Sequence, residues 1–333
     1  MKGNVPGRVP WLQHLQALAV QLQQSPYLNI VPEKRIRETL QLMGRSPDEH
    51  VTGAVAREIC ERENIKAALS GSIAALGSQY VISLEAVNCR TGDSLAREQV
   101  TPEAKEKVLP ALGTAASHLR GKLGESLGSI QQFDKPVEQV TTSSLEALKA
   151  YSQGHEIFQS GQQINAIPHF ERAVELDPNF AEAYQELAAI YANLGEEERS
   201  LVYEKKAFAL RDRVSERERL SINRAYYWMV TGELDKEIEA EEAWRQAYPR
   251  DTEPLNDMAV NHAIFMGQFD KGMEEASQAI CISSHELASL MWWQFRIWRR
   301  IVPTKRRQFS TRSLPIIPTT RQSILICVGW PPL

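Results

Sequence analysis

Residues 147–180 read ALKAYSQGHEIFQSGQQINAIPHFERAVELDPNF, two apolar helical segments that meet at Gly161. Gly154 in the first segment and Ala166 in the second are small residues, which let two helices approach closely. Pro178 stands just past the second segment, where it forbids the helix from continuing. The stretch therefore predicts a hairpin of two helices joined by a short turn.

This hairpin recurs along the chain. Four glycines that each close one helical stretch and open another lie 34, 37 and 35 residues apart: Gly161, Gly195, Gly232 and Gly267. Residues 181–214 repeat the pattern well, a third copy is looser, and a fourth begins as LNDMAVNHAIFMG with one extra residue ahead of its glycine. A period near 34 is typical of hairpins that bury their apolar faces only by stacking. These residues resemble the tetratricopeptide (TPR) repeat family, which implies an all-α superhelix, an α-solenoid, over 143–280, with about three repeats and a partial fourth.

Two short patterns mark helix starts in this region. Ser143-x-x-Glu146 and Ser215-x-x-Glu218 are capping boxes, in which the Ser and Glu side chains satisfy backbone N–H groups of the first helical turn. We therefore predict helices that are capped by Ser143 and Ser215.

The first 130 residues follow other periods. Apolar residues at helical spacing predict helices near 12–22, 33–43 and 112–127, with Leu127 on the apolar face of the last one. A further helix is predicted to start at the capping box Ser46-Pro47-Asp48-Glu49, which has Pro at its first helical position.

Strands are predicted in the same region. YLNIV at 27–31 has the composition of a short strand, and residues 80–87 alternate between two faces as a half-buried strand does. Residues 88–93 predict a hairpin loop that leads into SLAREQV at 94–100. The resulting order αβααβββα predicts a small α+β domain over residues 1–130.

Three segments of this domain carry a second resemblance: residues 25–46, 56–73 and 80–100. They are similar to the TolB N-terminal-like domain that accompanies TPR arrays in the non-catalytic region of acidobacterial serine/threonine protein kinases. The resemblance implies a sensory or docking segment that lies across a membrane from a kinase domain. This sequence has no Gly-rich phosphate loop, no H-R-D loop and no D-F-G motif, so we expect it not to transfer phosphate.

Two segments break the patterns. Residues 131–142, QQFDKPVEQVTT, are polar and predict a linker. The tail, 281–333, has eight Lys and Arg against the single acid Glu286, so its net charge is +7 whereas the rest of the chain carries −11. Four of the seven tryptophans also lie there. An abrupt switch of charge, aromatic content and period in mid-repeat is what an out-of-frame translation would produce.

Two other interpretations of the tail stay open. Leu287, Met291, Phe295 and Trp298 fall at helical spacing, so the tail is either irregular or contributes one amphipathic helix that caps the array. Stretches rich in Trp and Arg also contact anionic membranes or nucleic acid. We expect no nucleic-acid partner, because the rest of the chain is acidic, and membrane contact only through this tail.

The sequence patterns of catalytic and metal sites are missing. The seven histidines never take a ligand spacing such as H-E-x-x-H, so we expect no metal and no cofactor. Gly71 and Gly77 lack the spacing and the Lys of a phosphate loop and are expected to be strand or turn glycines. The dense carboxylates within 196–198 and 237–242 are expected to form a solvated helix surface. We therefore predict that the chain is not an enzyme.

Localisation stays open. No apolar run approaches the ~20 residues that cross a bilayer, and the basic N-terminus lacks the apolar core of a secretion signal. The expectation is cytoplasmic by default and extracytoplasmic if the chain derives from a kinase. The four cysteines have no metal spacing and no CxxC motif, so we expect buried or incidental thiols rather than a disulfide: Cys60, Cys89, Cys281 and Cys327.

The TPR resemblance also implies a binding site. In TPR proteins the first helix of each hairpin lines a groove that holds an extended peptide or a partner helix. Carried onto this sequence, the partner-binding positions are Tyr151, His155, Phe158, Gln185, Asn193, Asn223 and Tyr227. Aromatic and amide groups favour an extended peptide, and the negative body favours a neutral or basic partner. For Tyr151 and Phe158, packing between hairpins is the alternative role.

We therefore expect a non-catalytic protein–protein interaction scaffold with an unidentified protein or peptide ligand. The alternative is a detached extracytoplasmic sensor or regulatory region of a bacterial serine/threonine kinase or cyclase-type regulator.

Overall fold

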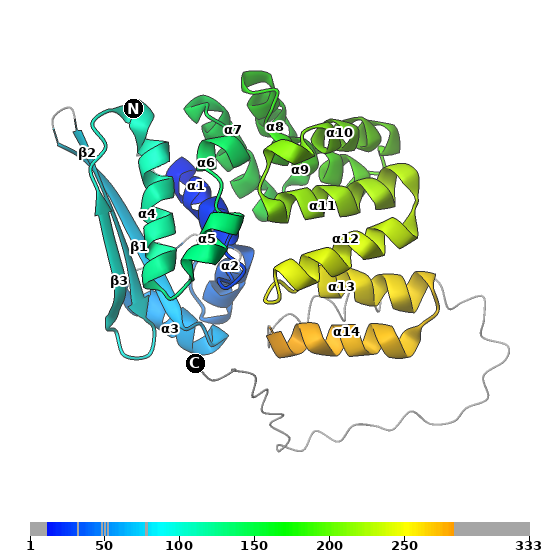
Figure 1. The fold of residues 1–333 in the computed structure, drawn as a ribbon, viewed down its shortest axis with the longest axis horizontal. Helices are drawn as coiled ribbons and strands as arrows, with labels where there is room; N and C mark the ends of the chain where they lie inside the picture. The colour runs from blue at the N-terminus through cyan, green and yellow to red at the C-terminus, as the bar shows by residue number, and fades with distance from the viewer. Residues whose placement is uncertain are drawn as a thin grey trace, which may run out of the picture. The chain divides into compact units, whose positions relative to one another are not determined.

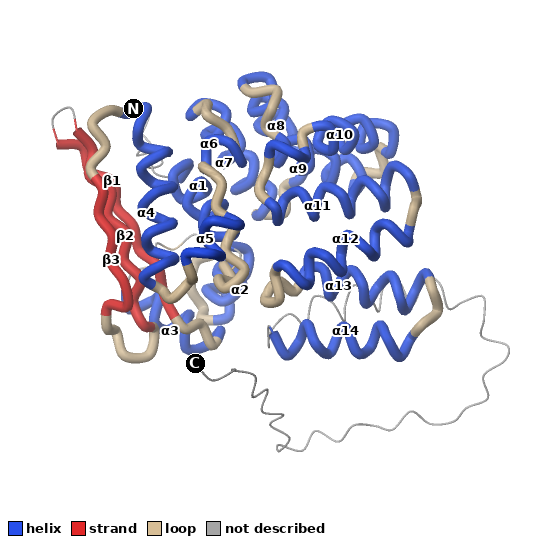
Figure 2. The backbone as a smooth tube through the Cα atoms, viewed as in Figure 1, coloured by secondary structure: helices blue, strands red, loops and turns tan. Residues whose placement is uncertain are grey.

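The fold is an α+β region followed by helical hairpins of the TPR kind, as a computed structural model of the chain shows (Figures 1 and 2). The structure describes residues 12–31, 33–47, 49, 51, 53–76 and 79–282. The chain divides into two compact units whose boundary in the sequence lies between Asp251 and Thr252, and each is described by itself. The domain boundaries expected from the sequence stay predictions, and the expected tail lies outside the described residues from position 283 onward.

Within the described residues the α+β region has six α-helices, one short 3₁₀ turn and three strands. The helices and strands are α1 (Leu12–Gln23), α2 (Glu33–Leu42), α3 (Gly53–Glu63), β1 (Ala67–Leu76), β2 (Gln79–Asn88), β3 (Ser94–Val100), α4 (Val108–Lys122), α5 (Leu127–Phe133) and α6 (Val137–Val140). The strands form one antiparallel sheet in the order β1-β2-β3. Helix α4 covers one face of the sheet, where Ile82 and Leu84 of β2 are buried with Leu112 and Leu119 of α4 (Figure 1).

Three sequence predictions in this region were wrong. Residues 27–31 form a loop instead of a strand, and Tyr27 is 52% exposed, because this segment pairs with none of the strands β1, β2 and β3. Helix α3 starts at Gly53, since Ser46 forms a turn with the N–H of Glu49 instead. Helix α4 ends before Gly124, whose φ of +100° only glycine adopts readily, so Leu127 lies on α5 and is 76% exposed.

A disulfide joins Cys60 at the end of α3 to Cys89 after β2, with their Cα atoms 5.8 Å apart. The sequence prediction of incidental thiols was therefore wrong for this pair. The two cysteines are 29 residues apart, and only the packing of α3 beside β1 brings them together. Local spacing carries no trace of such a bond, because its geometry depends on the tertiary fold.

A buried ion network ties α1, α4 and α5 together. The Arg120 side chain is fully buried and donates to both oxygens of Glu125, at 2.9 and 2.8 Å, and to Asp134 at 2.6 Å. Ser25 donates to Glu125 at 2.6 Å and Gln21 donates to Asp134 at 2.7 Å. The buried carboxylate of Glu125 and the half-buried carboxylate of Asp134 in this Arg120 network thus each have a cation and at least one neutral donor.

Helix α1 also packs against α7, so the α+β region and the first hairpin share one apolar core. The segment predicted as a linker takes part in this core, because Val137 of α6 is only 1% exposed. The hairpins of the first unit are built from six α-helices: α7 (Leu145–Gln159), α8 (Gln163–Leu176), α9 (Ala181–Asn193), α10 (Glu197–Ala209), α11 (Glu216–Tyr226) and α12 (Leu234–Ala247). Consecutive helices pair as α7 with α8, α9 with α10 and α11 with α12.

The predicted role of the four repeat glycines as helix ends is confirmed. Gly161, Gly195, Gly232 and Gly267 all have φ between +68° and +83°, the left-handed conformation that ends a helix and that glycine adopts without strain. Gly154 is the predicted close approach, since an added Cβ would lie 3.0 Å from the Cβ of His169. The capping box at Ser215 is present as predicted, whereas the first cap is Ser144, one residue after the predicted position.

The second unit contains the fourth hairpin, made of α13 (Glu253–Val260) and α14 (Phe269–Ile282). A π-helical turn over Asn261–Phe265 follows α13 and takes up the extra residue ahead of Gly267, because each π turn is wider than an α turn. At Gly272 an added Cβ would lie 2.7 Å from the Ala259 carbonyl oxygen, so only glycine lets these two helices approach so closely.

Candidate functional site

Ionisable side chains gather where the first helices of three hairpins face one another. We call this group the inner cluster: Tyr151 and His155 from α7, Glu182 and Glu186 from α9, and Glu218 from α11. The Tyr151 hydroxyl lies 3.4 Å from Glu186 Oε1 and also hydrogen-bonds Glu182. Nδ1 of His155 lies 3.4 Å from the same Glu186 oxygen. Helices of different repeats therefore meet through polar groups on this face.

Helical spacing explains why these residues meet. Tyr151 and His155, like Glu182 and Glu186, are four residues apart and so share one face of their helix. The rings of Tyr151 and His155 stack with centroids 5.8 Å apart. Glu218 belongs to the capping box of α11, in which its carboxylate accepts from the Ser215 N–H at 3.2 Å. This cap fixes the Glu218 carboxylate at the start of α11.

Two glutamates of the inner cluster hold their protons unusually well. Burial raises the pKa of Glu182 to about 7, and the charge of Glu186 adds to the rise despite the Tyr151 hydrogen bond. Burial together with the charge of Glu182 raises the pKa of Glu218 to about 8. Within the part of the chain that the structure describes, Glu182 Oε2 and Glu218 Oε1 are buried without a hydrogen-bond partner. Near pH 7 the pair therefore carries less than its full charge.

Two arginines contact the helices that carry the inner cluster or lie on them. Arg217 lowers the pKa of both Glu182 and Glu218, but its guanidinium is bonded to Asp251 at 2.7 Å and lies over the Trp244 ring. Arg37 of α2 lies 4.0 Å from Glu156 of α7, which is a contact between the α+β region and the first hairpin.

The predicted partner-binding residues of the first hairpin take different positions. Tyr151 is fully buried and packs on Phe170 and Phe180, so its ring serves the packing role that the sequence left open. Phe158 is partly buried against the core. His155 has a side chain that is 23% exposed and remains within reach of a ligand. Their role in binding stays a prediction.

Among the described residues, the hydrogen bonds and ion pairs of the inner cluster do not involve the predicted residues of the later hairpins. Asn193 donates to Gln163 at 3.3 Å, which ties α9 to the start of α8. Tyr227 packs edge-on to Phe208. Gln185 and Asn223 are half-buried on α9 and α11. As binding residues these four remain predictions.

Sequence reasoning did not place Glu182, Glu186 and Glu218 among the residues of the candidate site. The available signal was weak: Glu182 and Glu218 are 36 residues apart, close to the repeat period, but so are many other pairs. A related prediction was wrong, because Glu237 and Glu241 are 2% and 0% exposed rather than solvated. Both lie on the buried face of α12 together with Ala240 and Trp244, and the carboxylate density of the sequence does not show which face of a helix is buried.

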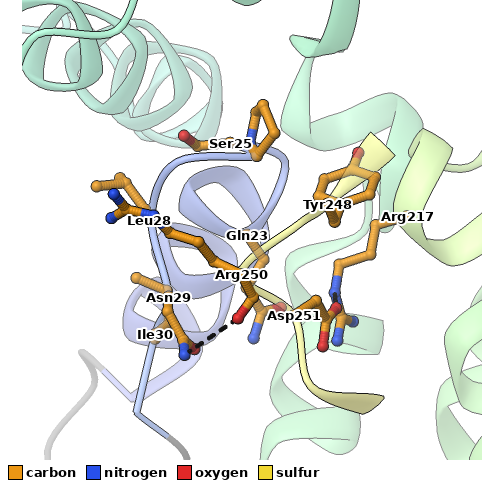
Figure 3. A pocket seen from close by; sticks show the side chains of 10 residues that line it. Gln23, Ser25, Leu28, Asn29, Ile30, Arg217, Tyr248, Arg250 and Asp251 are labelled. Atoms are coloured by element: carbon orange, nitrogen blue, oxygen red, sulfur yellow. Dashed lines mark hydrogen bonds and ion pairs between the residues drawn. The ribbon is translucent and has the colours of Figure 1, made fainter. Parts of the chain in front are cut away.

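A small cavity lies between the loop after α1 and the end of the third hairpin (Figure 3). Its volume is about 50 Å³, and it is bordered by Asn29, Arg217, Tyr248 and Arg250 among others. Asn29 donates to the Arg250 carbonyl at 3.5 Å and Arg250 donates to the Tyr27 carbonyl at 3.0 Å. Pockets for small molecules measure roughly 300–1,000 Å³, so this cavity has room for water only.

Comparison with known proteins bears on the hairpins. Residues 154–195 match the family model of the TPR repeat. This segment runs from Gly154 in α7 to Gly195 after α9, so it contains much of the first two hairpins. TPR repeats generally bind protein partners, which makes protein–protein interaction the function class that the match supports.

Solved structures also resemble the chain, and no curated protein matches it. A crystal structure of MamA aligns with a TM-score of 0.32 and 18% identity over 52% of this chain and 90% of MamA. A crystal structure of MamA protein aligns with a TM-score of 0.31 and 19% identity over 53% and 87% of the two chains.

The described residues contain neither a metal-binding cluster nor a membrane-spanning helix. No group of three or more His, Cys, Asp or Glu side chains there could hold a metal ion. None of the helices within those residues has the length and apolar character needed to cross a membrane.

Proposed function

We propose that the chain is a non-catalytic protein-interaction scaffold whose partner binds along the first helices α7, α9 and α11. The TPR match over residues 154–195 carries this proposal, together with the paired and stacked helices around it. Such hairpins present the same helix of every repeat on one side, which creates a continuous surface for an extended ligand.

The inner cluster supports a basic partner. It brings three carboxylates together with one histidine, and the charge of the residues before the tail is negative. A Lys or Arg side chain placed near Glu182 and Glu218 would favour their ionised forms and lower their raised pKa values. Opposite charge across an interface also speeds association and excludes acidic competitors.

The experiment compares two labelled extended peptides of equal length, one rich in Lys and one rich in Glu, by fluorescence anisotropy. We expect the Lys-rich peptide alone to bind, and we expect E186Q and H155A to weaken it because both residues are partly exposed at the inner cluster. E175Q is the matched control, since Glu175 is 64% exposed on α8 and pairs only with its neighbour Arg172 among the contacts described here. Equal binding of both peptides, or equal loss in E175Q, would contradict the proposal.

One observation favours the alternative context, an extracytoplasmic regulatory region. The Cys60–Cys89 disulfide is of the kind that persists in oxidising compartments. Trapping of free thiols in intact cells, followed by mass spectrometry of the peptides with Cys60 and Cys89, tests this. A bonded pair supports the extracytoplasmic context, and two alkylated thiols would exclude it. Association with a kinase remains a prediction.

A further inference from the structure

The two edges of the sheet differ in how they are protected. Among the residues that the structure describes, the order β1-β2-β3 leaves β1 and β3 as edge strands. Natural proteins protect edge strands with charged residues or proline, because a bare edge pairs with other strands. β3 carries Arg97, whose side chain is 69% exposed, next to Glu98. β1, by contrast, has the sequence AALSGSIAAL, without a charge or a proline.

The unprotected edge is also accessible. Residues 69–72 of β1 are exposed, and Leu69 is 39% exposed although it lies on the face that α4 covers further along the sheet. Gly71 presents no side chain at this edge, and an added Cβ would lie 3.1 Å from the Leu84 side chain of β2. A glycine inside a strand often marks a place where another backbone approaches closely.

The sequence of β1 is nearly the same in both directions from Gly71. Ser70 and Ser72 flank it, then Leu69 and Ile73, then Ala68 and Ala74. When two such strands pair antiparallel about a two-fold axis at Gly71, each residue faces the one equally far from the axis on the other side. Leu69 then faces the partner's Ile73, and Ser70 faces the partner's Ser72. The facing pairs are apolar with apolar and hydroxyl with hydroxyl.

We propose that two copies of the chain associate through their β1 edges in this antiparallel register, with Gly71 at the two-fold axis. The two three-stranded sheets become one continuous sheet across the dimer. The second copy is the occupant that this edge fits, because the near-palindrome matches the strand to itself and places no charge opposite residues 67–75. On the α4 face, Ile73 of the partner subunit covers the exposed Leu69.

The association is expected to depend on concentration. Stable dimers bury about 1,200–2,000 Å² of surface, whereas paired strands of ten residues are only about 34 Å long and one chain wide. Sedimentation velocity over a dilution series is therefore the measurement, and the full chain is the sample. The wild-type chain should shift from dimer to monomer on dilution.

Charge substitutions on the exposed face test the register. In S70K/S72K every introduced lysine faces a lysine of the other copy, so the dimer should be lost at all concentrations. In S70K/S72E every introduced lysine faces an introduced glutamate, so the dimer should return. Both positions are exposed, and Glu85, the β2 neighbour of Ser70, places a negative charge beside the lysine at position 70. Both variants should therefore fold, which thermal melting checks.

The control is Q99K on β3, at the protected edge, which should dimerise as the wild type does. A wild-type chain that stays monomeric at every concentration would overturn the proposal and leave the edge to a strand of a different protein. A dimer that survives S70K/S72K, or one that S70K/S72E fails to restore while its fold is intact, would equally overturn it.

Discussion

The Arg120 network and the inner cluster bury ionisable groups in opposite ways. In the Arg120 network, burial would raise the pKa of Glu125, but the hydrogen bonds from Arg120, Ser25 and Ser129 outweigh it and leave that pKa below its ordinary value. In the inner cluster, burial prevails and the pKa values of Glu182 and Glu218 rise to about 7 and about 8. Paired charges fix helices in place, whereas carboxyls that keep their protons form a surface that a cation can ionise.

The largest change in the free energy of unfolding is expected in the Arg120 network, where the buried charges are paired. R120A leaves the buried carboxylate of Glu125 and the half-buried carboxylate of Asp134 without their cation, so the free energy of unfolding should fall by about 3–5 kcal/mol. Urea unfolding measures the change. R97A removes an ion pair whose arginine is 69% exposed and should leave the unfolding midpoint unchanged. Similar losses in both variants would show that the Arg120 network does not hold the helices.

The disulfide offers a second test within the α+β region. C60S/C89S opens a covalent loop with a sequence separation of 29, and the free energy of unfolding should fall by about 3–4 kcal/mol. A reductant should lower the melting temperature of the wild type but leave the double variant unchanged. Titration of thiols in denaturant should also find two more thiols after reduction. A wild-type chain that is insensitive to reductant would contradict the bond.

A smaller effect is expected for the inner cluster. An unfolded glutamate has a pKa near 4.5, so between about pH 4.5 and pH 8 the folded chain binds more protons at Glu182 and Glu218 than the unfolded chain does. The free energy of unfolding should therefore decrease as the pH rises through this window, by on the order of 1 kcal/mol per pH unit. Urea unfolding at pH 5 and pH 8 measures the slope.

E182Q/E218Q should flatten that slope, because glutamine mimics the protonated acid at every pH. A residual slope is expected from Glu204, where burial likewise raises the pKa to about 7. E175Q, at an exposed site, should keep the wild-type slope. If the double variant had the same pH dependence as the wild type, Glu182 and Glu218 would not be the groups that cause it.

Local signals in the sequence predicted local structure well. The glycines at 161, 195, 232 and 267 end helices because a single backbone conformation requires them, and Gly154 is needed for one close contact. The loop at 27–31 was mistaken for a strand because strand formation depends on a partner that the sequence does not show. For the same reason the Cys60–Cys89 bond and the Glu182–Glu218 pair were missed: each joins different elements, and only tertiary packing brings them together.

Proton release on binding tests most directly our proposal that the inner cluster receives a basic partner. Calorimetric titration of the Lys-rich peptide at pH 7, in buffers of different ionisation enthalpy, counts the protons exchanged. A cation that ionises Glu182 and Glu218 should release protons into the buffer, and E182Q/E218Q should abolish the release. Binding with no proton release in the wild type, or equal release in the double variant, would contradict the claim.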